Sequence, residues 1–261
     1  MKEKSSLTAA YLNTVYCTDG RSLYGFLRTH YHHLRRHDEK IAEYADPNIA
    51  LRFVRKTDYP DVVVLAEILG SKQRDQVSRL LCMNGYYHIH YGAGQRANGI
   101  DGHDGIILAT KMPSIGIELP DLVHQKADQH GNGGGLVAAH LPDLDCTVSA
   151  GHLPFPSRKE CYAEQIGALK DVMKSARDRC RMVMGDFNMT PERLRGEHPG
   201  LVEGMKLLTP NAPTCSTVVG IEEVYSECLD QAWGSGFDVI ESHTVLDQSD
   251  HMGLHMNLKP Q

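Results

Sequence analysis

Asp186 and Asn188 follow an apolar segment, residues 181–185, that predicts a buried strand. They lie in the run Gly185-Asp186-Phe187-Asn188, and Thr190-Pro191 then predicts a turn and the start of a helix. A carboxylate there can orient a water molecule, and a carboxamide can donate a hydrogen bond to a phosphate oxygen. Because Asp and Asn also favour turns for conformational reasons, a plain turn is the alternative interpretation.

Two other groups of residues offer a cation site and a proton donor. Asp250 and His251 precede an apolar strand expected at 252–258, and they supply a hard oxygen ligand and an imidazole that can be charged. A surface turn is the alternative there. Glu67 lies inside the β-branched run Asp61 to Leu69, which predicts a strand buried on both faces. A carboxylate in such a strand is costly unless it is ion-paired or binds a metal, and the metal is favoured.

Polar residues also interrupt other apolar segments. Asn13, His152 and Asp230 each lie in or beside an expected strand, where a lone polar side chain is commonly a satisfied hydrogen-bonding group of the core. Arg96 lies in a glycine-rich loop, residues 92–102, and is a candidate phosphate clamp.

Composition limits the classes of protein to which the chain can belong. Its 261 residues, 41% hydrophobic and 23% charged, are typical of a folded globular protein and exclude disorder. The net charge is −6, and residues 181–261 alone carry five basic against twelve acidic side chains. A protein that coats nucleic acid by counterion release would be basic. A phosphate-bearing substrate would therefore need a metal cation to bridge it to the carboxylates, and a solvated acidic surface is the alternative.

The cysteine pattern and the apolar pattern predict the compartment. Seven cysteines without a Cys-x-x-Cys spacing favour a reducing environment, and there is no signal-peptide pattern at residues 1–4. No apolar run approaches the roughly 18 residues that a membrane-spanning helix needs. We therefore expect a cytoplasmic protein with no stable membrane insertion.

The elements that position these residues alternate between strands and helices. Strands are expected at 7–16, 61–69, 86–91, 104–110, 115–119, 135–141, 145–151, 181–185, 213–217, 228–233, 238–244 and 252–258. Helices are expected at 33–57, interrupted by Pro47, at 71–80, and from a cap at Ser157 to about Arg179. No linker or repeat divides the chain. This pattern predicts one layered α/β domain over residues 1–261.

Taken together, these motifs resemble the endonuclease/exonuclease/phosphatase superfamily, which includes deoxyribonuclease I. The resemblance covers essentially the whole chain and follows the superfamily's order and spacing: Asn13, Glu67, His152, Gly185-Asp186-Phe187-Asn188, Asp230 and Ser249-Asp250-His251. The fold that it implies is a four-layer α/β sandwich, with two mixed β-sheets packed face to face and helices outside.

The resemblance also implies a role for each residue. Asn13, Glu67 and Asp250 would bind Mg²⁺, with Mn²⁺ as a possible substitute. Asp186 would orient or deprotonate the attacking water. Asn188 and His152 would contact the phosphate, and Asp230 would keep His251 protonated.

Departures from the superfamily pattern reduce the number of activities that the chain is expected to have. Ala66 stands where relatives have glutamine, and Ala150-Gly151-His152-Leu153 replaces the strand ending of abasic-site repair enzymes, which disfavours that activity. The leading hypothesis is a Mg²⁺-dependent phosphodiesterase that hydrolyses DNA or RNA. The alternatives are a phosphoesterase acting on a phosphoinositide, a sphingolipid or another small phosphate ester, and a non-catalytic binding protein on the same scaffold.

Overall fold

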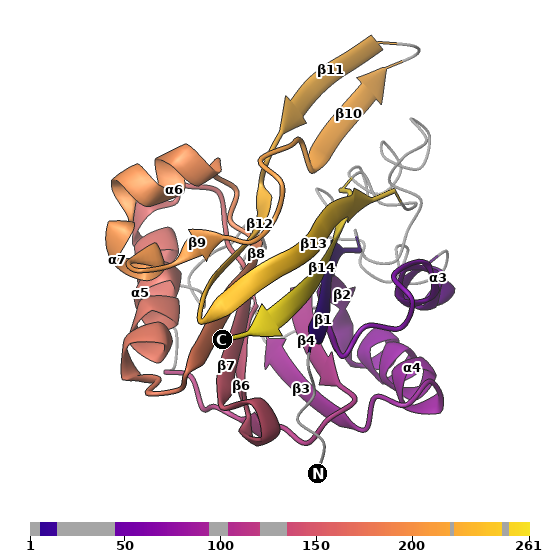
Figure 1. Ribbon diagram of the computed structural model, residues 1–261. Coiled ribbons are helices and arrows are strands. Elements are labelled where there is room, and N and C mark those ends of the chain that lie inside the picture. Colours follow the sequence, from indigo (N-terminus) through magenta and orange to yellow (C-terminus); the bar gives the residue numbers. More distant parts are fainter. Residues whose placement is uncertain (1–5, 15–44, 94–103, 121–134, 220–221, 247–250) are drawn as a thin grey trace.

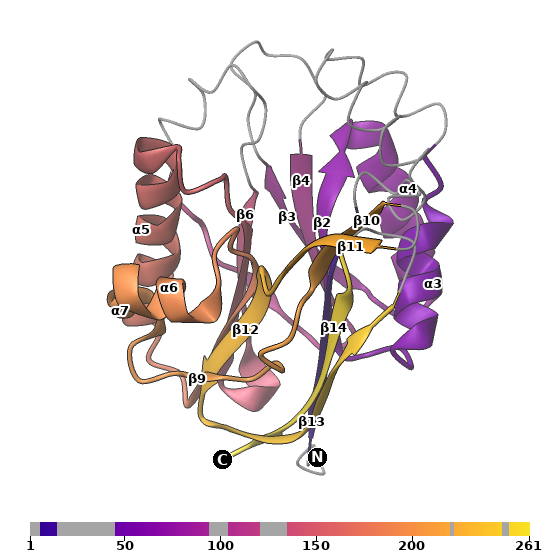
Figure 2. The same ribbon diagram turned by 90° about the horizontal axis from the view of Figure 1, so that it is seen from above.

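Two six-stranded β-sheets lie face to face with helices on their outer sides, which makes a four-layer α/β sandwich as expected (Figures 1 and 2). The structure is a computed structural model, and it describes residues 6–14, 45–93, 104–120, 135–219, 222–246 and 251–261. Part of the predicted helix at 33–57, and all of Arg96 and Asp250, lie outside the described residues.

The first sheet has the strand order β13-β14-β1-β2-β4-β3. Its β1 and β2 run parallel and its other neighbouring strands run antiparallel. The bounds are β1 (Leu7–Asn13), β2 (Val62–Leu69), β3 (His88–Ala93), β4 (Asp104–Thr110), β13 (Phe237–Val245) and β14 (Gly253–Pro260).

The second sheet has the order β5-β6-β7-β8-β12-β9. Here β7 and β8 are the parallel pair. The bounds are β5 (Ile115–Gly116), β6 (Leu136–Leu141), β7 (Cys146–His152), β8 (Cys180–Asp186), β9 (Lys206–Leu207) and β12 (Asp230–Ser235). Each sheet thus contains one parallel pair whose carboxyl ends lie at a common edge, where polar side chains that follow the strands can meet.

A two-stranded hairpin, β10 (Cys215–Val219) and β11 (Glu222–Glu227), projects beyond the sandwich (Figure 1). The hairpin follows directly after Thr214 and returns to β12. Its base therefore lies next to the strand that carries Asp230.

The helices cover the two outer faces separately, as Figure 2 shows. α3 (Asn48–Lys56) and α4 (Gly70–Met83) lie on the first sheet, and α5 (Lys159–Ser175), α6 (Pro191–Glu197) and α7 (Pro199–Val202) on the second; a 3₁₀ turn spans Pro142–Leu144. α3 is amphipathic: Ile49, Phe53 and Val54 are buried, while Arg55 and Lys56 are exposed. No helix among the described residues combines the length and apolarity that spanning a membrane requires.

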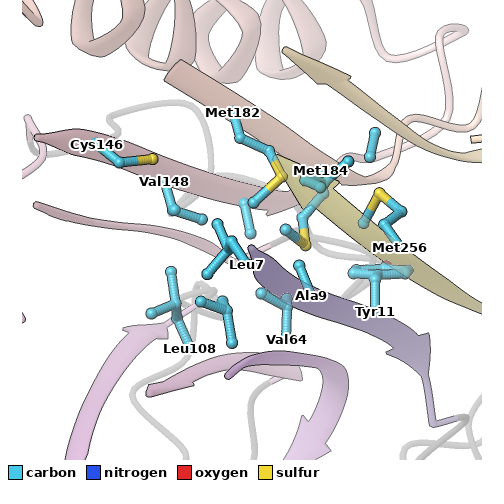
Figure 3. Packing of buried hydrophobic residues seen from close by; sticks show 14 of the residues in the cluster. Leu7, Ala9, Tyr11, Val64, Leu108, Cys146, Val148, Met182, Met184 and Met256 are labelled. Atoms are coloured by element: carbon cyan, nitrogen blue, oxygen red, sulfur yellow. The ribbon is translucent and has the colours of Figure 1, made fainter. Parts of the chain in front are cut away.

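The central core lies between the two sheets (Figure 3). Leu7, Ala9 and Tyr11 alternate along β1 and point into it, as the two-residue period of a strand requires. Met182 and Met184 of β8 face them, and flexible thioether side chains fill such irregular spaces well.

The sequence-based elements differ from the structure mainly at their ends. The prediction that Ser157 caps a helix reaching Arg179 was wrong: α5 begins at Lys159 after Arg158, which makes no side-chain cap bond, and ends at Ser175. The strand expected at 115–119 is only β5, two residues long. β11 was not predicted, because its sequence EEVYSE lacks an apolar alternation.

Gly185 is required where β7 and β8 approach each other. A Cβ atom at this position would lie 1.9 Å from the carbonyl oxygen of Gly151, its partner in the parallel register. We expect Gly185→Ala to lower the free energy of unfolding by roughly 2–4 kcal/mol, because backbone must move to relieve the clash. Gly167→Ala, in α5, is the matched control because nothing lies within 4 Å of its added Cβ. Denaturant unfolding of both variants would measure the difference, and equal stabilities would contradict the argument.

Candidate active site

The candidate site lies where the two parallel strand pairs end. Asn13 is the last residue of β1, and Glu67 lies near the end of β2. His152 and Asp186 are register partners at the ends of β7 and β8, and Asp230 pairs with Asp186 from β12. Residues far apart in the sequence are thus brought to one edge by both sheets.

Asp186 is the centre of this group. Its side chain is almost fully buried, and its Oδ2 lies 3.3 Å from Asn13 Nδ2, 3.7 Å from His152 Nε2 and 3.9 Å from His251 Nε2. Its other oxygen, Oδ1, accepts the backbone N–H of Asn188 at 2.8 Å. One carboxylate oxygen is therefore held by the chain, while the other faces the nitrogen atoms of three different elements.

The turn that follows Asp186 combines the two interpretations made from the sequence. Asn188 has a φ of 47°, in the left-handed region, and its backbone N–H binds the preceding carboxylate, so the segment is indeed a turn. Asn188 therefore does not continue the alternation of β8 beside Asp186. Its Nδ2 donates to the Leu153 carbonyl at 2.7 Å and joins the Asp186 turn to the segment after His152.

Glu67 is aimed into the site by a local irregularity of β2. The register with β4 shifts between Leu65 and Ile68, which is a β-bulge, and Glu67 has a φ of 55°. Its Oε1 lies 3.1 Å from Asn13 Nδ2 and 3.3 Å from His152 Nε2. A left-handed non-glycine residue costs about 1–2 kcal/mol, and such strain is typical of functional positions.

Asp230 and His251 form a buried pair. The His251 Nδ1–H donates to Asp230 Oδ2 at 2.7 Å. Burial acts to lower the pKa of His251, but attraction to the Asp230 carboxylate and to Cys215 outweighs it and raises that pKa well above its ordinary value. Burial also raises the pKa of Asp230 to about 6, against the attraction of His251. At neutral pH the pair therefore consists of an imidazolium and a carboxylate.

Thr214 holds this pair in place from the base of the hairpin. Its Oγ1 accepts the backbone N–H groups of Leu229 and Asp230 at 3.0 and 2.9 Å. The next residue, Cys215, forms an isolated β-bridge with His251. The β10–β11 hairpin is thus tied directly to both members of the pair.

Tyr11 is a site residue that the sequence analysis missed. Its hydroxyl oxygen accepts the backbone N–H of Asp186 at 2.9 Å, although the ring lies in the core between the sheets. Burial, followed by the nearby Asp230 and Asp186 carboxylates, raises the pKa of Tyr11 well above its ordinary value, so the hydroxyl stays neutral. Its position two residues before Asn13 puts it on the same face of the strand, but an ordinary core tyrosine would have the same position.

Most of the expected site residues meet here. Asn13, Glu67, His152, Asp186 and Asn188 are joined by contacts between side chains or backbone groups, and the Asp230–His251 pair adjoins Asp186. The two expected residues Arg96 and Asp250 fall in segments that the structure does not describe.

The polar side chains around Asp186 have the chemistry of a divalent-cation site. Glu67 Oε1 and Asp186 Oδ2 both face Asn13 and His152 in a largely buried setting, and buried carboxylates are costly unless cations or hydrogen-bond donors compensate them. Carboxylate and carboxamide oxygens are the ligands that Mg²⁺ and Mn²⁺ prefer. The residues present therefore fit a hard divalent ion.

A second grouping shares Asp186. Ligand atoms of Asp186, Asp230 and His251 lie within 4.8 Å of one another. In this group Asp230 Oδ2 is already bonded to His251 at 2.7 Å, so a cation bound there would have to replace that hydrogen bond. A cation would therefore fit better on the side of Asp186 that faces Glu67, where no such hydrogen bond has to be broken.

Comparison of the sequence with models of known families and with curated proteins finds no match. Solved structures do match. An endonuclease/exonuclease/phosphatase from Beutenbergia cavernae DSM 12333 superposes with a TM-score of 0.68 at 19% identity, covering 98% of this chain and 72% of that chain. ANGEL2, a 2′,3′-cyclic phosphatase, gives a TM-score of 0.66 at 15% identity, covering 98% of this chain and 96% of that chain.

A third match is TDP2 from D. rerio complexed with a single-strand DNA product, with a TM-score of 0.61 at 14% identity, covering 98% of this chain and 100% of that chain. These similarities extend over almost the whole chain and include the strands that carry the site. The chain therefore has the endonuclease/exonuclease/phosphatase fold, as the spacing of its motifs predicts.

Proposed function

We propose that this protein is a phosphoric ester hydrolase that cleaves phosphodiester bonds, with nucleic acid as its leading substrate. The observation that carries the proposal is the surrounding of one buried carboxylate oxygen, Asp186 Oδ2, by Asn13, His152 and His251 at 3.3 to 3.9 Å. A base, a cation site and an imidazolium in contact are the groups that attack on phosphorus needs.

Glu67 and Asn13 would hold the divalent cation, with Mg²⁺ or Mn²⁺ favoured by their oxygen atoms, and Asp250 would be a further ligand, as the sequence predicts. When bound, the cation would neutralise the non-bridging phosphate oxygens and lower the pKa of a coordinated water. The chain's own carboxylates would otherwise repel a phosphate, which explains why an acidic protein would need the ion.

The remaining groups have separate tasks. Asp186, held by Asn188 and Tyr11, orients the attacking water and accepts its proton. His251, kept charged by Asp230, would donate one hydrogen bond, from its Nε2–H, to the oxygen that gains negative charge. His152 lies beside Asp186 and is positioned to contact the phosphate. In the superfamily pattern Asn188 also contacts the phosphate, and that role remains part of the proposal.

Nucleic acid is favoured as substrate by the proteins that share the fold. Among these, a TDP2 structure contains a single-strand DNA product, and an ANGEL2 structure contains adenosine-2′,3′-vanadate. A second candidate is a small phosphate ester, which the acidic balance of residues 181–261 favours, because a long polyanion would meet that charge. Both candidates use the same site chemistry.

The test is a substrate panel with Mg²⁺ or Mn²⁺: plasmid, single-stranded DNA, RNA, a phosphoinositide and sphingomyelin, each with and without excess chelator. We expect hydrolysis of nucleic acid that the chelator removes. Cleavage of only the lipid or small esters would select the second candidate. Absence of hydrolysis of every substrate would contradict the proposed activity and leave a binding protein on this scaffold.

Glu67→Gln tests the cation site separately from the chemistry. The substitution keeps the size and one oxygen ligand but removes the charge, so the Mg²⁺ concentration for half-maximal activity should rise roughly 10- to 100-fold. Turnover at saturating Mg²⁺ should fall much less. Glu241→Gln, on the exposed face of β13, is the control and should leave the Mg²⁺ dependence unchanged. An unaltered dependence in Glu67→Gln would remove this residue from the cation site.

The last part of the proposal concerns the cellular location and the domain organisation of the protein. We propose a cytoplasmic location, because the six described cysteines are free thiols, as in a reducing compartment. We also propose a single domain over residues 1–261, because the two sheets share one core.

A further inference from the structure

A groove of about 730 Å³ lies beside the candidate site, between the segment after β7 and the segment after β8. Phe155, Tyr162, Met189 and His198 give it aromatic and thioether walls, and Lys159 adds a positive charge at its edge. The roles assigned above to the site residues make no use of these side chains.

The groove is built on the same two segments that carry the site. Phe155 follows His152 by three residues, which places the two within roughly 10 Å along an extended chain. Met189 directly follows Asn188, whose Nδ2 donates to the Leu153 carbonyl at 2.7 Å. The groove and the site therefore border the same two segments of the chain, and a base joined to a phosphate at the site would lie near the groove.

Phe155 and Tyr162 are restrained in different ways. Phe155 lies between Pro154 and Pro156, which restrict its backbone, yet its side chain is exposed, with 52% relative accessibility for the residue. Tyr162 is fixed from below, because its hydroxyl donates to the Phe187 carbonyl at 2.9 Å, and its ring lies 5.4 Å from that of His198. The restricted backbone at Phe155 lowers the entropy that this segment loses when a flat ligand stacks on the ring.

The charged residues that line the groove favour a flat heterocycle over an acyl chain as its ligand. Arg193 and Glu197 line it and pair with each other at 2.9 Å. An acyl chain would lay methylene groups against this ion pair, which is unfavourable, whereas a flat heterocycle has polar edges that can meet it. Lys159 would form an ion pair with the next phosphate along a nucleic-acid strand.

We propose that this groove binds the base of the nucleotide whose phosphate lies at Asp186, by stacking on Phe155. The inference rests on the proposed function, because the phosphate must occupy the site for its base to reach the groove. In this proposal, the segments between β7 and α5 and between β8 and α6 determine the preference for a nucleotide over other phosphate esters. Base–aromatic stacking tolerates different bases, so the groove would favour nucleotides without selecting one sequence.

Binding of two probes that differ only by a base tests the inference without catalysis. Adenosine 5′-monophosphate and ribose 5-phosphate are titrated into the full chain by calorimetry in excess Mg²⁺. We expect the first to bind roughly 5- to 100-fold more tightly, the range for one stacked base. In Phe155→Ala this ratio should fall towards one, since the phosphate contacts remain. Ala163→Trp, at an exposed position of α5 that lines the groove, should also lower the ratio, by filling the space.

Tyr87→Ala is the matched control. Tyr87 is more exposed than Phe155, and it precedes β3 at the end of the first sheet where His88 pairs with Thr110, opposite the end that carries Glu67. The binding ratio should stay at the wild-type value. A ratio near one in the wild type, or an unchanged ratio in Phe155→Ala, would overturn the inference. Failure of the hydrolase proposal would appear separately, as no hydrolysis in the substrate panel.

Discussion

Asp186→Asn should reduce turnover by roughly 10² to 10⁴-fold while the protein still folds. The substitution keeps the oxygen that accepts the Asn188 backbone N–H, so the turn after β8 is preserved. The other oxygen, Oδ2, faces Asn13, His152 and His251. The substitution replaces this oxygen by an NH₂ group and removes the negative charge. A neutral carboxamide cannot take a proton from water, and general-base groups contribute factors of this size.

Thermal unfolding and turnover measured on the same preparation would check this result. The Asp186 carboxylate also contributes to the raised pKa of Asp230, so its neutralisation removes a repulsion and should not lower stability strongly. Asp171→Asn, at an exposed position of α5, controls for the loss of one negative charge and should retain full turnover. Near-normal activity of Asp186→Asn with a normal melting curve would exclude Asp186 as the base.

The pair formed by Asp230 and His251 should control the basic limb of the pH–rate profile. Activity requires charged His251, which is present below its raised pKa and lost as the pH rises through that value. Asp230→Asn removes the carboxylate 2.7 Å from Nδ1, so the pKa of His251 should fall and the basic limb should move to lower pH. His251→Ala should lose roughly 10²-fold or more of the activity at every pH.

These profiles should be measured at saturating Mg²⁺, because metal-bound water titrates in the same range. His243→Ala is the control, since His243 lies on exposed β13 and contacts Glu241 rather than the site. A basic limb that does not move in Asp230→Asn, together with an active His251→Ala, would show that the pair only stabilises the fold.

The arrangement of the strands and the meeting of the site residues were predictable from the sequence. Continuous apolar runs mark β1, β2, β7 and β8, and a polar residue at the end of such a run has few structural reasons to be there. Their convergence was implied by the resemblance to the superfamily, and the structure places Asn13 and Glu67 near the ends of one parallel strand pair and His152 and Asp186 at the ends of the other.

Other parts of the site depend on geometry that no local pattern contains. The left-handed φ of Glu67 and the bulge that aims its side chain follow from pairing with β4, more than 30 residues later in the sequence. Tyr11 has the sequence environment of an ordinary core residue. Packing between the sheets brings its hydroxyl within hydrogen-bonding distance of the Asp186 backbone N–H. The Phe155 groove joins two segments whose proximity is visible only after folding.

The division of the site between the two sheets has a consequence for folding. Asn13 and Glu67 belong to the first sheet, while His152, Asp186 and Asp230 belong to the second, so no single sheet contains a complete site. The methionine-containing core between the sheets, together with contacts such as the hydrogen bond from the Asp186 N–H to the Tyr11 hydroxyl, sets their distances. A compact intermediate with both sheets formed and this core still loose would have native secondary structure but no active centre. The rate at which activity returns during refolding would therefore report the rate at which the core between the two sheets packs. The rate of strand formation would be measured separately.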